Sequence, residues 1–447
     1  MNSLKRVNNE KNFIPFFLML FDILAIYVSI VIAYFLVKYI GAYYEFVPAG
    51  EYIQYVDKLI VYIIIITSLY GLGVYKYRHD FWEETYLIIK ALVISLFMVL
   101  SVLALNKVVF DYSSVVVVFS FVIMGFFIPF MKYILKKKLS VFGFWPKRAK
   151  VISGNSDIVQ EIFNNNYLGY VKSSSSESEV VFIDTAGSTL KHIEDKISTL
   201  MQQKKEIVFI PMLNNFNYSR AGIVEVFNSR TNMIVLESSL LKKYNIALKK
   251  ISDLLLALLL LPLLIPIFAI IIYLMKREEP KGSIFFTQDR MGKNEETFTC
   301  YKFRSMREDG DAILAKYLKE NPQEVENYSI YHKYENDPRV TKIGAFMRKT
   351  SLDELPQIIN VLKGEMSLIG PRPYMLNEKE KIGDKLNLVL AVPPGISGLW
   401  QVSGRSDVDF HSRVEMDVYY TRNWNLWLDF VILLKTIKTV LFREGAS

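Results

Sequence analysis

The sequence predicts a membrane α-helical bundle of four transmembrane helices, a Rossmann-like α/β module, and a mixed, mainly α-helical domain that begins with a re-entrant membrane helix hairpin. We place these parts at residues 1–138, 139–248 and 249–447. Three observations lead to this fold class. Hydrophobic residues make up 51% of the 447 residues and gather in long runs, as membrane segments do. Short apolar stretches then alternate with helical ones, and a last apolar run carries two prolines.

Four apolar runs open the chain, and each is about long enough to cross a hydrocarbon core of roughly 30 Å. They are Phe13–Lys38, Leu59–Val74, Thr85–Leu105 and Val115–Leu135. Lysines and arginines cluster before the first run, between the second and third, and after the fourth, so the positive-inside rule places these parts in the cytoplasm. Asp22 lies inside the first run. It is either a functional intramembrane acid or, the interpretation we favour, a structural one near the cytoplasmic end.

The second part alternates between predicted strands and helices. The strands are Val151–Ile152, Val180–Asp184, Ile207–Pro211 and Met233–Leu236, and the helices are Asp157–Phe163, Thr189–Gln203 and Ser219–Asn228. This alternation favours a small parallel sheet. The turn at Ser153–Asp157 lacks the glycines of a dinucleotide-binding loop. We therefore expect a Rossmann-like module without a cofactor, with a role in regulation or assembly.

The third part begins with the apolar run Ile251–Met275, which contains Pro262 and Pro266 and has lysines and arginines at both ends. Prolines four residues apart favour a sharp bend. A re-entrant hairpin that enters and leaves the cytoplasmic leaflet agrees with the prolines and with the charges. The alternative is an ordinary fifth spanning helix.

Adjacent carboxylates at Asp353 and Glu354 follow the cations Arg348 and Lys349. Such a group suits chemistry on phosphate, because cations hold phosphoryl oxygens while carboxylates bind Mg²⁺ or attack phosphorus. The net charge of +8 agrees with positive-inside topology and with attraction to anionic lipids and phosphates. We expect no nucleic acid as a partner, since no nucleic-acid-binding motif occurs. A single cysteine, Cys300, excludes an intramolecular disulfide.

Several dense motifs follow the hairpin in order. They are Ser283–Gly292, Tyr301–Met306, Asp337–Thr341, Ser351–Gln357, Ser367–Pro373, Pro394–Arg405 and Glu415–Tyr420. With these motifs, from Lys249 to about Arg443, the sequence resembles the bacterial monotopic phosphoglycosyl transferases, the polyprenyl-phosphate sugar-1-phosphate transferases. The N-terminal bundle and the α/β module resemble those of the long-form members, typified by the undecaprenyl-phosphate galactose phosphotransferases.

The resemblance implies a ping-pong reaction in which Asp353 attacks the β-phosphorus of a UDP-sugar, releases UMP and forms an aspartyl-phosphosugar. Undecaprenyl phosphate then takes up the sugar phosphate, which starts an O-antigen, capsule or exopolysaccharide. The implied metal is Mg²⁺, held by Asp353 and Glu354. The candidate substrate-binding residues are Lys302, Arg304, Arg348, Arg372, Arg405 and Asp417, with Asp337 as a further supporting residue.

Some alternatives stay open at this point. Arg372 lies in a Gly-Pro-Arg-Pro turn that is either a rigid phosphate contact or purely structural. Arg405 and Asp337 are either supporting residues or members of intradomain ion pairs. Ile265 replaces the serine that the family often has at the bend. The stretch around Trp424 and Trp427 either lies on the membrane interface or packs as a core helix.

The expected location is the bacterial inner membrane, with the catalytic domain in the cytoplasm and in contact with membrane lipids. Two rival functions remain: a glycosyltransferase that would release UDP, and a scaffold with a decayed catalytic domain. The sequence selects neither the sugar nor the glycan pathway, and it leaves open a homodimer through the bundle or the α/β module.

Overall fold

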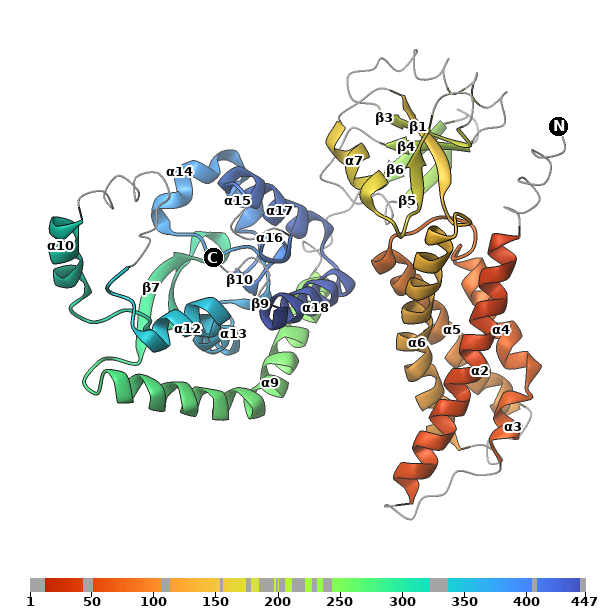
Figure 1. The fold of residues 1–447 in the computed structure, drawn as a ribbon, viewed down its shortest axis with the longest axis horizontal. Helices are drawn as coiled ribbons and strands as arrows, with labels where there is room; N and C mark the ends of the chain where they lie inside the picture. Colours follow the sequence, from red (N-terminus) through yellow and green to blue (C-terminus); the bar gives the residue numbers. More distant parts are fainter. Residues whose placement is uncertain are drawn as a thin grey trace. The chain divides into compact units, whose positions relative to one another are not determined.

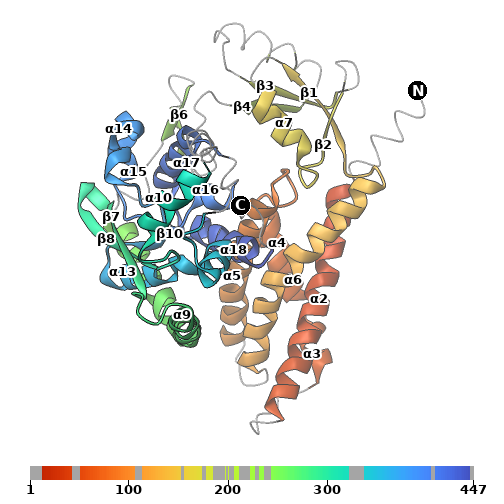
Figure 2. The ribbon, with the colours of Figure 1, turned by 60° about the vertical axis from the view of Figure 1, so that its left-hand side comes forward.

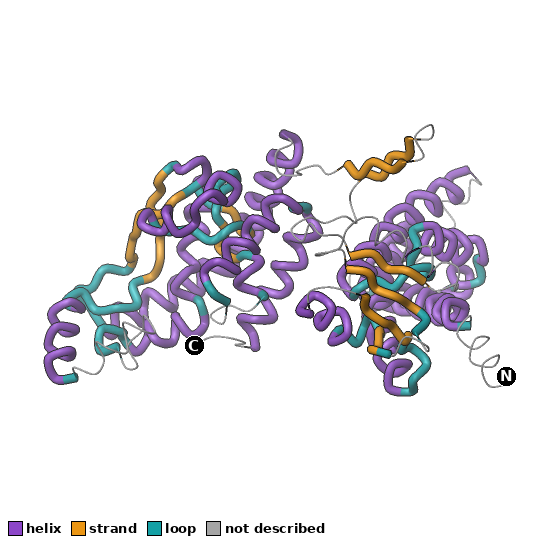
Figure 3. The backbone as a smooth tube through the Cα atoms, turned by 90° about the horizontal axis from the view of Figure 1, so that it is seen from above, coloured by secondary structure: helices purple, strands orange, loops and turns teal. Residues whose placement is uncertain are grey.

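The computed structural model describes most of the chain, and Figure 1 shows its fold. The chain divides into two compact units, residues 1–212 and 213–447. Helices predominate in both units, and the strands form small separate groups (Figure 3). The described residues are 13–42, 51–105, 113–152, 156–173, 178–184, 206–210, 222–226, 231–235, 243–321, 337–403 and 408–442, together with Ile197 and Leu200.

The first unit contains the apolar helices that the sequence predicts. They are α2 (Ile14–Gly41), the short α3 (Tyr52–Val56) with α4 (Leu59–Gly71), α5 (Phe81–Leu105) and α6 (Ser114–Val141). All four stretches are long and apolar enough to cross a membrane. Ile26, Ile65, Ile88 and Met124 are fully buried between them, while many other apolar side chains face outward. An apolar exterior of this extent suits a lipid environment.

A group of ionisable side chains lies buried inside this bundle. Lys132 Nζ on α6 lies 3.0 Å from Asp22 on α2 and 3.3 Å from Glu84 on α5, and Lys136 also pairs with Glu84. The Tyr75 hydroxyl donates to Asp22 at 2.7 Å. Buried charges are tolerated when they are paired in this way. These contacts agree with the structural interpretation of Asp22.

A parallel sheet follows the bundle in the same unit, with strand order β2-β1-β3-β4. The strands are β1 (Lys147–Ile152), β2 (Tyr170–Lys172), β3 (Val180–Asp184) and β4 (Glu206–Ile210), and α7 (Ser156–Asn164) connects the first two. β3 is almost completely buried, as expected for an inner strand of a parallel sheet. The sequence analysis did not predict β2. The expected helix Thr189–Gln203 lies largely outside the described residues, so the complete Rossmann-like layout stays a prediction.

Arg78, which follows α4, joins the bundle to this sheet. Its guanidinium donates to the carbonyl oxygens of Trp145, Leu168 and Gly169 at 2.7–2.9 Å, and it lies 4.2 Å from the Trp145 ring centre. Gly169 has φ +66°, and a Cβ there would lie 2.3 Å from the indole. Only glycine fits at this junction.

The second unit begins with one strand pair where the sequence predicted a helix. The prediction of a helix at Ser219–Asn228 is wrong, because β5 (Gly222–Val226) pairs antiparallel with β6 (Thr231–Val235). The segment Gly-Ile-Val-Glu-Val starts with a poor helix former and is rich in β-branched residues. Both features favour a strand.

Helix α9 (Lys243–Glu278) follows and contains both Pro262 and Pro266. Figure 1 shows that it bends along its length. The sequence predicted a sharp bend at these prolines within a re-entrant hairpin. The segment is one continuous helix that bends, because prolines remove single hydrogen bonds without ending the helix. Only 11% of its most apolar window is buried. The re-entrant path stays a prediction, with a spanning helix as its alternative.

A buried polar network ties the first half of α9 to the rest of the unit. Lys249 Nζ lies 3.0 Å from Asp253 and 2.8 Å from Asp429 of α18 (Leu426–Phe442). The Ser367 hydroxyl donates to Asp253 at 2.7 Å, and the Tyr420 hydroxyl donates to Asp429 at 2.8 Å. Trp424 is buried, whereas the apolar side chains of Phe430, Leu434 and Ile437 on α18 are exposed. This C-terminal stretch therefore has a core face and an exposed apolar face.

The remaining elements surround a two-stranded hairpin and a short parallel strand pair. The hairpin is β7 (Phe285–Met291) with β8 (Thr297–Phe303), and it lies next to α13 (Ile358–Lys363), as Figure 2 shows. The parallel pair is β9 (Ser367–Ile369) with β10 (Gly395–Ser397). The helices are α10 (Gly310–Glu320), α12 (Lys342–Thr350), α14 (Lys379–Ile382), α15 (Leu386–Val389), α16 (Leu399–Val402) and α17 (Phe410–Asn423).

Candidate active site

The Asp353-Glu354 pair lies on a 3₁₀ helix, η6 (Leu352–Gln357), directly after α12. The Thr341 hydroxyl accepts from the Gly344 amide at 2.9 Å and caps the start of α12. Ser351 ends α12 with φ 55° and ψ 20°. A left-handed conformation at a residue other than glycine costs energy, and such residues gather at functional sites. Here the left-handed conformation of Ser351 ends α12, and η6 with the two acids begins at the next residue.

Lys302 on β8 holds one acid of the pair. Its amine donates to Glu354 at 2.6 Å, and both side chains are partly buried. Burial works to lower the pKa of Lys302, but the Glu354 carboxylate outweighs it, and the pKa is raised. Lys302 is therefore a fixed cation beside the pair. Its predicted role in phosphate binding stays a prediction.

Asp353 makes no such ion pair among the described residues. Burial raises its pKa to about 6, and the neighbouring Glu354 charge adds to the shift, while Lys302 and Arg348 oppose it. Two carboxylates with different surroundings divide their tasks. Glu354 is held by a lysine, whereas Asp353 stays available and is mostly ionised at pH 7.

The predicted arginines take different places. Arg348 is in the last turn of α12, donates to the Ser305 hydroxyl at 2.8 Å, and acts electrostatically on Asp353. Arg304 instead pairs with Glu308 at 3.2 Å, and its buried Nε has no partner in the described part of the chain. The structure thus brings Lys302 and Arg348 to the acid pair and gives Arg304 a different acidic partner.

Arg372 lies in a turn that close backbone contacts hold rigid. The Gly370 amide donates to the Ser397 carbonyl at 2.9 Å, and the Gly395 amide donates to the Pro371 carbonyl at 2.8 Å. A Cβ on Gly395 would lie 2.1 Å from the Gly370 nitrogen, so no other residue fits. The Arg372 guanidinium lies 5.6 Å from the Trp400 ring centre. A rigid turn of this kind agrees with Arg372 as a phosphate contact and also with a purely structural turn.

Asp417 on α17 supports the same turn from inside the protein. Its Oδ2 accepts from the Arg372 amide at 3.1 Å and from the Tyr374 hydroxyl at 2.8 Å. The side chain is fully buried, and burial raises its pKa to about 7. Asp417 is therefore best described as a positioning residue for Arg372.

Sequence reasoning did not select Arg290 on β7, although its motif was noted. The guanidinium is largely buried, donates to the Pro373 carbonyl at 3.3 Å and to Gln288 at 2.7 Å. Burial lowers its pKa, and the charges of Arg372 and Glu354 both act on it. Arg290 thus contacts the Gly-Pro-Arg-Pro turn directly. The polar residues of β7 are consecutive, so no alternation in the sequence marks Arg290 as buried.

The two remaining predicted residues are Asp337 and Arg405. Asp337 forms a bidentate ion pair with Arg339, at 2.7 Å for the closest contact, which agrees with the intradomain alternative. Arg405 lies outside the described residues.

The donor set fits Mg²⁺ but not a metal cage made by the protein alone. Among the described residues, no three His, Cys, Asp or Glu side chains gather to hold a metal. Mg²⁺ characteristically takes one or two carboxylates and completes its shell with water and substrate phosphates. Asp353 and Glu354 are suited to this, because the charge repulsion between them would be relieved by a cation.

Comparison with known proteins places this arrangement in a family. Residues 244–443 match the model of the bacterial sugar transferases. A UDP-galactose-lipid carrier transferase of Erwinia amylovora is 30% identical over 83% of this chain and 84% of its own length. This protein is a bacterial sugar transferase. An undecaprenyl-phosphate galactose phosphotransferase of Salmonella typhimurium is 29% identical over 96% of this chain and 95% of its own length.

The sugar transferase is therefore an enzyme of the phosphoglycosyl transferase class, and its resemblance to that family is confirmed. An exopolysaccharide production protein of Sinorhizobium fredii is 44% identical over 44% of this chain, which covers 87% of its own length. The match thus covers most of this relative but less than half of the sugar transferase.

Proposed function

We propose that this sugar transferase moves a sugar 1-phosphate from a UDP-sugar to undecaprenyl phosphate through a covalent intermediate on Asp353. The observation that carries the proposal is the division of labour in the acid pair. Lys302 fixes Glu354 at 2.6 Å, while Asp353 is left partly buried with a pKa of about 6. A carboxylate with this pKa is ionised at neutral pH and remains nucleophilic.

In the first half-reaction, a carboxylate oxygen of Asp353 attacks the β-phosphorus of the UDP-sugar. A new bond between that oxygen and phosphorus forms, the bridging bond to the α-phosphate breaks, and UMP leaves with the electron pair. Lys302 and Arg348 lie where they can hold the phosphoryl oxygens as charge redistributes. Arg290 and Arg372 are the next cations along the site and suit the leaving phosphate.

In the second half-reaction, the phosphate oxygen of undecaprenyl phosphate attacks the same phosphorus. The bond to Asp353 breaks, the carboxylate is regenerated, and the sugar diphosphate lipid leaves. Mg²⁺ bound by Asp353, Glu354 and the substrate would neutralise the diphosphate of the donor. A single phosphorus site thus serves a soluble donor and a lipid acceptor in turn.

The relatives support the acceptor and leave the sugar open. The names of related proteins specify galactose, glucose and N-acetylgalactosamine, and each of these includes undecaprenyl phosphate. We propose that this enzyme starts an O-antigen, capsule or exopolysaccharide at the cytoplasmic face of the inner membrane. The α9 exterior, which is largely apolar and exposed, supports a membrane location for the catalytic unit.

The test is a nucleotide-release assay on the full chain in nanodiscs with Mg²⁺, undecaprenyl phosphate and a panel of UDP-sugars. We expect UMP with one donor, a mass increase of one sugar phosphate on the protein without acceptor, and loss of both in Asp353→Asn. Asp384→Asn, which changes an exposed acid with no recorded ion pair, is the matched control. Release of UDP would instead indicate a glycosyltransferase, and activity in Asp353→Asn would exclude the proposed nucleophile.

A further inference from the structure

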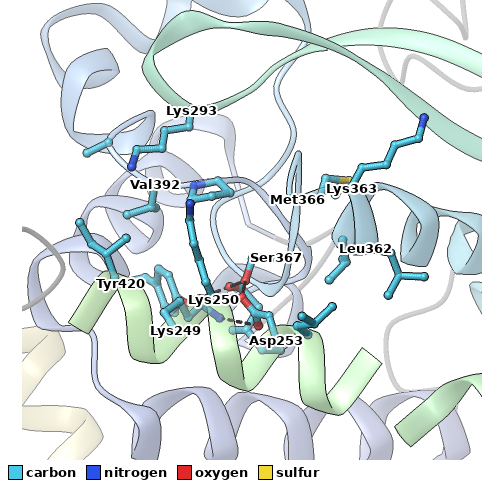
Figure 4. Close-up of a pocket in the computed structure, with 17 residues that line it drawn as sticks. Lys249, Lys250, Asp253, Lys293, Leu362, Lys363, Met366, Ser367, Val392 and Tyr420 are labelled. Carbon is cyan, nitrogen blue, oxygen red and sulfur yellow. Dashed lines mark hydrogen bonds and ion pairs between the residues drawn. The ribbon is translucent and has the colours of Figure 1, made fainter. Parts of the chain in front are cut away.

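A cavity of about 210 Å³ lies between the first half of α9, the end of α13, β9 and the loop before β10. Figure 4 shows this cavity with its lining side chains. Its lining contains neither member of the acid pair, nor Lys302, nor Arg372. The cavity is therefore distinct from the acid pair, although both belong to the second unit.

Four lysines line the cavity: Lys249, Lys250, Lys293 and Lys363. Lys249 forms ion pairs with Asp253 and Asp429, and Lys363 donates to the Tyr301 hydroxyl at 2.9 Å. Lys250 and Lys293 have no recorded acidic partner in the described part of the chain. Figure 4 shows Lys250 extending from α9 toward the side where Lys293 lies, while Lys363 points away from both. Two cations thus remain available to an anion.

The rest of the lining is mainly apolar and continues onto the outside of α9. Leu254, Val361, Leu362 and Val392 line the cavity, and Leu254 is 45% exposed. Further along the helix, Leu255, Leu258 and Leu259 are exposed as well. A molecule with an anionic head at the lysines and an apolar tail along α9 would be matched over its whole length.

We propose that this cavity binds an anionic phospholipid of the bilayer, with its phosphodiester at Lys250 and Lys293 and an acyl chain along α9. Free phosphate would leave the apolar walls uncovered. The phosphate of the acceptor lipid must reach Asp353 to react, and Asp353 is not in the cavity lining. A resident phospholipid is the occupant that satisfies both conditions, and it would fix the depth of α9 in the membrane.

The experiment is native mass spectrometry of the full chain in detergent, titrated separately with phosphatidylglycerol, with phosphatidylcholine of the same acyl chains, and with undecaprenyl phosphate. We expect the wild type to retain phosphatidylglycerol in preference to phosphatidylcholine. Each lysine near a membrane surface contributes about fivefold, so Lys250→Gln with Lys293→Gln should weaken phosphatidylglycerol binding by about 25-fold. Lys281→Gln with Lys316→Gln removes the same charge from exposed positions outside the cavity and should change binding less than twofold.

Three results would overturn the proposal: equal binding by the pocket double variant and the wild type, equal losses in both double variants, or undecaprenyl phosphate displacing phosphatidylglycerol and losing its own binding in the pocket variant. The last result would assign the cavity to the acceptor.

Should the pocket double variant fail to fold by circular dichroism, Ala391→Phe decides, because it fills the cavity without changing charge. It should reduce phosphatidylglycerol retention, and unchanged retention would refute the assignment. Binding is measured without turnover, so the outcome is independent of the proposed reaction.

Discussion

Replacing Lys302 by glutamine tests how the acid pair is controlled. The amine lies 2.6 Å from Glu354, and the two side chains are 27% and 30% exposed. Lys302 also lowers the pKa of Asp353, against the burial that raises it to about 6. Without the lysine, less positive charge would offset the repulsion between the carboxylates of Asp353 and Glu354. We therefore expect the pKa of Asp353 to rise.

The size of the rise follows from the contacts. A cation close to a buried carboxylate lowers its pKa by about 1 to 3 units. Lys302 is in direct contact with Glu354, whereas it acts on Asp353 only electrostatically. Water reaches the side chains of Lys302 and Glu354, so the lower limit of about one unit applies. The midpoint then moves from about 6 to about 7. At pH 6 the ionised fraction falls from about one half to about one tenth, a loss of about fivefold, and this part of the defect disappears above about pH 8.

The assay is single-turnover UMP release from pH 5 to pH 9 in saturating Mg²⁺. Lys302→Gln should show a constant loss from the missing phosphate contact and an additional loss that grows as the pH falls. Lys319→Gln, at an exposed position on α10, is the control. A Lys302→Gln profile with the wild-type midpoint would refute the electrostatic link between Lys302 and Asp353.

The remaining predictions concern the metal, a buried acid and the bundle. Glu354→Gln should lower UMP release by about 10- to 100-fold and raise the Mg²⁺ concentration for half activity; an unchanged Mg²⁺ requirement would contradict a role in metal binding. The Asp417 carboxyl, with its pKa raised to about 7, keeps its proton in the folded state where the unfolded chain loses it near pH 4. The folded state should therefore lose stability as the pH rises from about 4 to 7, and Asp417→Asn should flatten this slope in thermal unfolding at pH 5 and pH 8. Lys132→Met should destabilise the bundle by about 3 to 5 kcal/mol and Asp22→Asn should recover part of it, as measured by chemical unfolding in detergent; additive losses would exclude their coupling.

Periodicity and composition predicted the elements whose cause is local. Long apolar runs gave the apolar helices of the first unit, and buried runs such as Val180–Asp184 gave inner strands. Glu354 and Lys302 were chosen because of their residue types and surrounding motifs, and the structure pairs them directly. Signals of this kind arise from each segment itself, so sequence reasoning can use them.

The errors concern features that depend on distant partners. The segment Gly222–Val226 is a strand because it pairs with Thr231–Val235, and no pattern within it records that partner. Arg290 lies in the first strand of the hairpin and Arg304 directly after the second, yet the first lies beside the Gly-Pro-Arg-Pro turn while the second pairs with Glu308. Their roles depend on tertiary folding, which brings together residues far apart in the chain.

The Lys249 network has a practical consequence for anyone who wishes to work without lipid. Its partners Asp253, Ser367 and Asp429 belong to three separate elements, so the apolar helix and the reaction centre are expected to melt in one step. Removing α9 to obtain a water-soluble fragment would take the Lys249 cation away from Asp429 and the Asp253 carboxylate away from Ser367. Amide protons of β9 should then exchange faster when a harsh detergent loosens α9. The apolar helix α9 is thus part of the packed structure of this unit, and its removal should destabilise the rest of the unit.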